Sequence, residues 1–305
     1  MRKITPFLLA FLLSASSCTP PNYDKIPLAP VKMGTQWGYI NKVGETVIKP
    51  KFDSAGNFKE GLAWIKLDGK WGYIDKSGKT VIKPKFDGIR GFQEGLALVL
   101  LDGKWGYVDK AGKTVIKPQF YGAGDFKEGV ARIKLDNGWG YVDKDGEVVI
   151  NPQFDEAGDF KEGLARIKLG SVWGYADKTG KIVINPQFDE AGDFKEGLAW
   201  IKLKKGGDTY SYTKWGYIDK IGKIVIEQQF EEVKDFQEGL AWTKLGDKYG
   251  YIDKARKIVI SPHFDEAGDF KEGLAKIKFG SKWGYIDKTG KIVINPQFGD
   301  VGDFY

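Results

Sequence analysis

A tryptophan–glycine pair that returns at a fixed interval constrains this 305-residue chain more than any other feature. Six of the seven intervals between successive pairs are 34 residues, and the remaining one is 42. The position is occupied by Trp37, Trp71, Trp105, Trp139, Trp173, Trp215, Tyr249 and Trp283. A constant period over most of a chain marks a repeat protein, in which each unit contacts its neighbours. The sequence therefore predicts eight copies of one unit of 34 residues.

The residues of one unit predict a meander of short strands. Leu62 to Leu67 mixes β-branched and aromatic residues with lysine, which is typical of a strand. Asp68-Gly69 predicts a type I′ hairpin, because both central residues of that turn need a positive φ. Trp71 to Asp75 is expected to form the second strand and Lys79 to Lys83 the third.

The end of the unit is less regular. Pro84 is expected to end the third strand, because proline has no N–H to donate to a ladder. Phe86 to Gly95 is expected to form either a fourth short strand or a packed loop. Each unit is therefore expected to have three or four strands, and the predicted fold class is all-β.

The central strand is apolar on both faces. Trp71 and Tyr73 point to one face and Ile74 to the other, because successive side chains alternate along a strand. A sheet of this kind must be covered on both sides, so we expect the units to stack on one another. A single unit is not expected to fold alone.

Two architectures satisfy this stacking: a closed β-propeller and an open β-solenoid. The first unit begins at Leu28-Ala29, and Phe298 to Tyr305 supplies the segment that this unit lacks. Joining the two would close a ring and remove exposed sheet edges. We therefore expect a closed β-propeller, with an open β-solenoid as the alternative.

The motif W-G-Y-[IV]-D-K-x-G-K-x-V-I-x-P-x-F recurs nearly intact, for example from Trp71 to Phe86. It resembles the WG repeat, also called the KWG repeat, of a family that is found in many bacterial proteins. The resemblance covers about residues 31 to 305. It implies β-rich repeats and an interaction role. It brings no catalytic residues, because the family is named for its repeat alone.

The first part of the chain predicts export. Residues 1–17 form a signal peptide, in which two basic residues precede a mostly apolar stretch, residues 4–13, that is too short to span a membrane. Cys18, the only cysteine, follows small residues and looks like the lipidated cysteine of a bacterial lipoprotein. Residues 18–30 would then be a lipidated, proline-rich tether for the repeat domain, residues 31–305. The alternative is a plain secretory signal in which Cys18 is incidental.

Composition and motifs argue against catalysis and against nucleic-acid binding. The net charge is only +6 although 29% of the residues are charged, and no basic stripe is present. His263 is the only histidine and is expected to be a surface substitution, so a nucleophile–histidine site is disfavoured. Asp75 and Glu60 recur in the same context in almost every unit, which indicates structural roles. We expect no catalytic residue, no metal and no cofactor.

Departures from the repeat give the candidate contact residues. The third residue of the L-A-x strand varies among the copies, and three copies carry Trp64, Trp200 and Trp242 there. These indoles are expected to face solvent, where they would suit stacking on a sugar or a partner protein. The alternative is that they pack against neighbouring units. An insert in one hairpin adds a second candidate contact loop with Tyr210 and Tyr212.

Together these features predict an exported lipoprotein of the cell envelope that is anchored to a membrane and faces the periplasm or the cell surface. It is expected to be a non-enzymatic binding or scaffold protein with an unknown protein or glycan partner and no nucleic-acid partner. The alternative is a carbohydrate-binding or glycan-hydrolysing propeller that uses paired carboxylates at its centre. The first hypothesis is favoured because no carboxylate pair departs from the repeat pattern.

Overall fold

The computed structural model describes residues 27–203 and 214–304, which form β-strands and no helix. The candidate residues Cys18, Tyr210 and Tyr212 lie outside the described residues. The strands form eight antiparallel sheets, numbered here 1 to 8 along the chain, of which sheet 1 has three strands and the others four. The predicted fold class, an all-β protein of eight repeated meanders, is confirmed.

Each four-stranded sheet contains strands a, b, c and d in chain order, and among the described residues sheet 1 has only strands b, c and d. The a strands are short: β4 (Ser54–Ala55), β8 (Gly88–Ile89), β12 (Gly122–Ala123), β16 (Glu156–Ala157), β20 (Glu190–Ala191), β24 (Glu232–Val233) and β28 (Glu266–Ala267). The b strands are β1 (Ala29–Met33), β5 (Leu62–Leu67), β9 (Leu96–Leu101), β13 (Val130–Leu135), β17 (Leu164–Leu169), β21 (Leu198–Leu203), β25 (Leu240–Leu245) and β29 (Leu274–Phe279).

The c strands carry the tryptophan–glycine pair: β2 (Gln36–Ile40), β6 (Lys70–Asp75), β10 (Lys104–Asp109), β14 (Gly138–Asp143), β18 (Val172–Asp177), β22 (Lys214–Asp219), β26 (Lys248–Asp253) and β30 (Lys282–Asp287). The d strands are β3 (Thr46–Phe52), β7 (Thr80–Phe86), β11 (Thr114–Phe120), β15 (Val148–Phe154), β19 (Ile182–Phe188), β23 (Ile224–Phe230), β27 (Ile258–Phe264) and β31 (Ile292–Phe298).

The fourth strand exists, but it belongs to the next sheet. The a strand of sheet 3 follows the d strand of sheet 2 in the chain and pairs with β9, where Gly88 lies opposite Leu100. The hairpin prediction is also confirmed, because Asp68 and Gly69 have φ values of 52° and 75°.

The expectation that Pro84 ends the third strand is wrong. Strand β7 continues through Pro84 to Phe86, and its register against β6 shifts between Trp71 and Tyr73. Pro84 therefore lies in a bulge, where a ladder hydrogen bond from its nitrogen is not needed.

The same bulge explains the glycine of the tryptophan–glycine pair. A Cβ atom on Gly72 would lie 2.4 Å from the backbone oxygen of Ile82 and 2.7 Å from the nitrogen of Pro84. Equivalent close approaches occur at Gly38, Gly106, Gly140, Gly174, Gly216, Gly250 and Gly284. The motif thus keeps a glycine in each copy because the bulged d strand lies directly against it.

The hydrophobic core is divided among the junctions between sheets. Between sheets 5 and 6, Tyr175 and Phe188 of one sheet pack against Ala199, Ile201 and Ile218 of the next. The Tyr face of each sheet thus meets the Ala/Ile face of its successor, which confirms that both faces of the central strand are used. Within the described residues no sheet covers the last Tyr face. There Phe298 is 42% exposed, whereas the equivalent Phe188 is 2% exposed.

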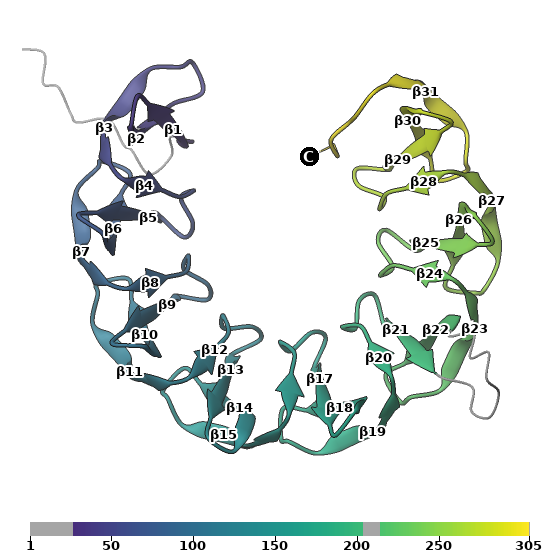
Figure 1. The fold of residues 1–305 in the computed structure, drawn as a ribbon, viewed down its shortest axis with the longest axis horizontal. Coiled ribbons are helices and arrows are strands. Elements are labelled where there is room, and N and C mark those ends of the chain that lie inside the picture. The colour runs from purple at the N-terminus through teal and green to yellow at the C-terminus, as the bar shows by residue number, and fades with distance from the viewer. Residues whose placement is uncertain (1–26, 204–213, 305) are drawn as a thin grey trace, which may run out of the picture.

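The eight sheets follow one another around an arc, with the d strands on its outer side (Figure 1). Sheets 1 and 8 are separated by a gap that is wider than the spacing between neighbouring sheets (Figure 1). The radial arrangement is the one that a propeller requires. The expected joining of the two ends is not seen in the described part of the chain, where β1 pairs with β2 alone and residues 299–304 form no strand.

Candidate binding surface on the inner loops

The loops that join the a and b strands lie on the inner side of the arc (Figure 1). These inner loops comprise residues 56–61, 90–95, 124–129, 158–163, 192–197, 234–239 and 268–273. They are positioned by two sets of contacts that recur from sheet to sheet, one made by tyrosines and one by glutamates.

The tyrosine of each c strand holds the inner loop of the next sheet. Tyr107 Oη donates to the carbonyl of Gly124 at 2.7 Å, and its ring lies 4.8 Å from the ring of Phe126. Burial raises the pKa of Tyr107, so its hydroxyl stays protonated and remains a donor. The equivalent tyrosines are Tyr39, Tyr73, Tyr141, Tyr175, Tyr217 and Tyr251. Tyr285 of sheet 8 donates instead to the carbonyl of Gly302, which follows β31.

The glutamate at the end of each inner loop of sheets 2 to 7 links its own sheet to the next one. Glu162 Oε2 accepts from the amide of Gly197 at 2.9 Å and lies 3.1 Å from Lys220, and both of these residues belong to the next sheet. Burial alone would raise the pKa of Glu162, but the hydrogen bonds from Lys220 and Gly197 lower it overall. Glu162 also has a positive φ of 52°. These contacts support the structural role that the sequence predicts for the repeated glutamates.

The repeated aspartates before the c–d turns also act within the fold. Asp177 Oδ1 accepts from the amides of Thr179 at 2.9 Å and Lys181 at 3.1 Å. The hydroxyl of Thr179 donates to the same oxygen and lowers the pKa of Asp177. Each such carboxylate closes its own turn, as the sequence predicts.

The variable position of the b strand lies beside the inner loop of its own sheet. The amide of Gly56 donates to the carbonyl of Trp64, and a Cβ atom on Gly56 would overlap the indole. Trp64, Trp200 and Trp242 are all half-buried. Each indole meets the aromatic residue of the tryptophan–glycine position at 70–73°, with ring centroids 5.0–5.4 Å apart. All three also pack against the hydrophobic cluster that their sheet shares with the next sheet, as the alternative expectation proposed, and each keeps a partly exposed surface.

The structure brings only two of the three tryptophans together. Trp200 lies on β21 of sheet 6 and Trp242 on β25 of the adjacent sheet 7. Trp64 lies on β5, on the opposite limb of the arc (Figure 1). A single ligand of small size therefore cannot contact all three.

Two copies carry arginine at the variable position, and each arginine contacts both its own sheet and the next one. Arg132 places its guanidinium carbon 5.3 Å from the ring centroid of Trp139 and donates from Nη1 to the carbonyl of Ala157 at 2.8 Å. Its Nε lies 3.0 Å from Asp159 Oδ1 in the next inner loop. The two atoms are not aligned as a hydrogen bond, so this contact is an ion pair. Each of these arginines therefore joins its own sheet to the next.

Arg166 repeats this arrangement with Trp173, the carbonyl of Ala191 and Asp193. Burial raises the pKa of Asp193, while the guanidinium of Arg166 opposes that shift. These aspartates were not among the residues predicted from the sequence to form a site. The available signal was the G-D-F motif, whose aspartate follows an arginine of the preceding copy by 27 residues.

Sheets 7 and 8 carry the same aspartate without its arginine. Asp235 and Asp269 are half-buried and follow the variable position of the preceding sheet, which holds Trp200 and Trp242. Neither carboxylate forms an ion pair or a hydrogen bond with another described residue. These two inner-loop positions thus retain the acceptor and lack the internal cation.

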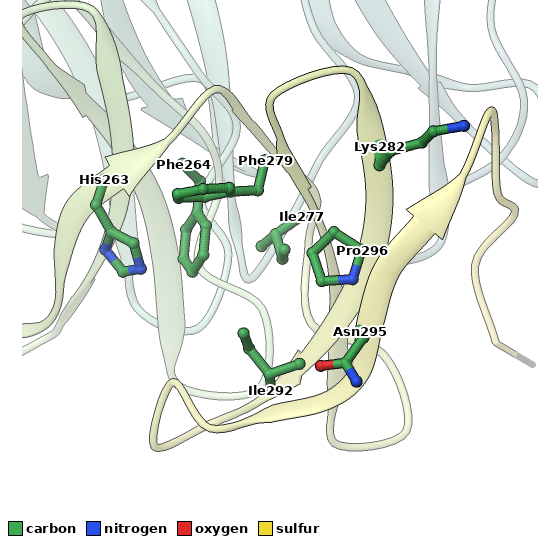
Figure 2. Close-up of a pocket in the computed structure, with 8 residues that line it drawn as sticks. All are labelled: His263, Phe264, Ile277, Phe279, Lys282, Ile292, Asn295 and Pro296. Carbon is green, nitrogen blue, oxygen red and sulfur yellow. The ribbon is translucent and has the colours of Figure 1, made fainter.

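A separate cavity of about 480 Å³ lies between sheets 7 and 8 (Figure 2). Its lining is mainly apolar and consists of His263, Phe264, Ile277, Phe279, Lys282, Ile292, Asn295 and Pro296. His263 is exposed and its ring lies 3.9 Å from that of Phe264. The lining contains no carboxylate, thiol or hydroxyl, so no serine, threonine or cysteine nucleophile lies beside the histidine in this cavity.

Two further features of the described residues concern metals and membranes. No group of three or more histidine, cysteine, aspartate or glutamate side chains within residues 27–203 and 214–304 is arranged to hold a metal ion. Those same residues contain no helix of the length and apolar character needed to cross a bilayer.

Comparison with known proteins agrees with the observed repeats. Among solved structures, one titled "Crystal structure of the eukaryotic initiation factor" is similar with a TM-score of 0.59 and 10% identity, over 93% of this chain and 87% of that chain. Dihydro-heme d1 dehydrogenase NirN has a TM-score of 0.45 and 14% identity, over 90% of this chain and 74% of that one. No curated protein sequence matches the chain.

The family described as "WG containing repeat" matches eight consecutive segments: residues 37–71, 71–105, 105–139, 139–172, 173–206, 215–249, 249–283 and 283–305. Each segment begins at the aromatic residue that precedes the bulge-covered glycine. The matches account for most of the chain, and the chain therefore belongs to the WG-repeat family.

Proposed function

We propose that this protein is an exported, membrane-anchored binding or scaffold protein without enzymatic activity, and that its partner contacts the inner loops. The observation that carries the proposal is the distribution of variation among the copies. The tyrosine and glutamate contacts that hold the inner loops recur along the arc. The adjacent variable position instead holds Trp64, Leu98, Arg132, Arg166, Trp200, Trp242 or Lys276.

A constant frame with variable side chains at one position is typical of repeat proteins that bind a partner along a concave surface. The anchor is part of the same proposal and rests on Cys18 and the preceding small residues. Lipidation of Cys18 would place the inner loops at the envelope, within reach of a periplasmic or surface partner.

The inner surface is tested by photo-crosslinking in cells that express the full chain. A photoreactive residue at Arg90, in an inner loop and 53% exposed at its side chain, is compared with one at Ile258, which is 47% exposed on an outer d strand. We expect a discrete crosslinked species from position 90 and none from position 258. Equal crosslinking at both positions, or none at either, would contradict the proposal.

The anchor is tested by labelling with a palmitate analogue. Wild-type chain is expected to take up the label and to sediment with membranes, whereas Cys18→Ala is expected to do neither. Unchanged labelling of the variant would remove Cys18 from the proposal.

A further inference from the structure

In two copies of the repeat, the aspartate of an inner loop already binds a guanidinium group of the same chain. In sheets 4 and 5 a guanidinium lies between a tryptophan ring, a backbone carbonyl and the aspartate of the next inner loop. This is the usual environment of a bound arginine, which combines a cation–π contact with a charge-assisted contact. Each arrangement is filled by the chain's own Arg132 or Arg166.

The next two copies keep the aspartate and the backbone carbonyl, but a tryptophan replaces the arginine. Asp235 and Asp269 take the place of Asp159 and Asp193, and the carbonyls of Val233 and Ala267 take the place of those of Ala157 and Ala191. The variable residue is now an indole, Trp200 or Trp242, which adds a second aromatic side chain and no positive charge.

Three of the nearby lysines are engaged elsewhere, and Lys234, which precedes Asp235, is exposed and forms no ion pair with it. Lys195, on the inner loop of sheet 6, donates to Gln237. Lys202 lies over the ring of Trp215 and pairs with Glu190, and Lys244 lies over the ring of Tyr249 and pairs with Glu232. Asp235 and Asp269 are then half-buried carboxylates at the position that binds a guanidinium in the preceding copies, and a cation from outside the chain would complete this arrangement.

We propose that Trp200 with Asp235, and Trp242 with Asp269, form two adjacent sites for arginine side chains of a partner protein. This rests on the proposed binding function and names its chemistry. Because packed sheets are separated by about 10 Å, and three residues of an extended strand also span about 10 Å, the two sites suit arginines three positions apart. Guanidinium is preferred over ammonium because a planar group fits between an indole and a carboxylate.

The test uses the full chain in mild detergent and a labelled peptide with arginines at positions i and i+3. A matched peptide with citrulline in place of arginine has the same shape and no charge. We expect the arginine peptide to bind more tightly than the citrulline peptide, and to weaken as salt is raised.

Two substitutions turn one kind of copy into the other. Trp200→Arg with Trp242→Arg supplies the internal cation as in sheets 4 and 5, and should lower peptide affinity by about tenfold or more. Arg132→Trp with Arg166→Trp should create two further sites and raise the number of peptides bound. Because each residue already occurs at this position in the chain, both variants are expected to fold, which circular dichroism verifies.

The added charge is controlled by Ile258→Arg with Val183→Arg, which places two arginines on outer d strands. This control should bind as the wild type does. Unchanged affinity in the Trp-to-Arg variant, or an equal loss in the outer control, would overturn the proposal. If the variant with both Trp-to-Arg changes still crosslinks the same partner at position 90, the proposed binding function is supported and the proposal of arginine sites is wrong. If no partner is crosslinked at all, the proposed function itself fails.

Discussion

The junction between sheets 6 and 7 contains a buried polar residue where its counterparts are apolar, and this predicts a stabilising substitution. Thr243 is 1% exposed and lies opposite Gly250, just as Ile201 is buried opposite Gly216 in the preceding sheet. The same backbone position holds Ile65, Val99, Ile133, Ile167 and Ile277 in other sheets. An isoleucine is therefore expected to fit at position 243 with little strain.

Thr243→Ile replaces a buried hydroxyl by a methylene and adds a methyl group. At ~0.8 kcal/mol for each buried methylene-sized group, and with the cost of burying a hydroxyl removed, we expect a gain of about 1–2 kcal/mol in the free energy of unfolding. This corresponds to a rise in Tm of about 2–4 °C per kcal/mol for a domain of this size. Hydrogen exchange should slow most in peptides from sheets 6 and 7, because the change acts at their junction.

The matched control is the reverse change in the preceding sheet. Ile201→Thr should lower the free energy of unfolding by about 1–3 kcal/mol. The measurements are thermal unfolding followed by circular dichroism and hydrogen exchange read by mass spectrometry. An unchanged or lower Tm for Thr243→Ile, alongside the expected destabilisation by Ile201→Thr, would contradict this prediction.

Three further predictions concern the turn and bulge geometry and the buried tyrosines. Gly174→Ala should lower the free energy of unfolding by at least about 3 kcal/mol, because the added Cβ would lie 2.5 Å from the backbone oxygen of Ile184. Gly163→Ala should lower the free energy of unfolding by only about 1 kcal/mol, because the φ of 86° strains an alanine there but no other atom lies close to its Cβ. Urea denaturation measures both changes. Arg256→Gly should stabilise by about 1 kcal/mol in the same assay, since Arg256 has a φ of 74° at a turn position that glycine occupies elsewhere. Burial raises the pKa of Tyr175 above its ordinary value of 10.0, so the folded state keeps a proton that the unfolded state loses at alkaline pH. The free energy of unfolding should therefore fall as pH rises above about 10, and Tyr175→Phe should weaken that dependence in denaturant titrations; an equally steep fall in the variant would exclude Tyr175 as a contributor.

Much of the repeat fold could be predicted from local pattern. The interval between tryptophan–glycine pairs sets the number of units, and the alternation of Trp71, Tyr73 and Ile74 shows that both faces of the strand are buried. The turn at Asp68-Gly69 was predictable because only a few residue types accept its backbone angles.

The contacts that cross between units were not predictable in this way. The expectation that Pro84 ends a strand was wrong, because the strand continues through a bulge. That bulge depends on Gly72 in the neighbouring strand and is not visible in the local sequence around Pro84. The role of Asp159 depends on Arg132, which lies 27 residues earlier in the chain and in another sheet. A linear pattern records which residues repeat, but not which pairs the stacking brings together.

The repeat unit, its strands and the apolar character of both sheet faces can be predicted from the sequence, because they follow from periodicity and local backbone preference. Tertiary structure alone decided which side chains of adjacent copies share a site, since that depends on how one sheet lies on the next. Trp200 therefore appeared in the sequence as one of three equivalent tryptophans. The stacked sheets place Trp200 and Trp242 on adjacent sheets and Trp64 on the opposite limb of the arc.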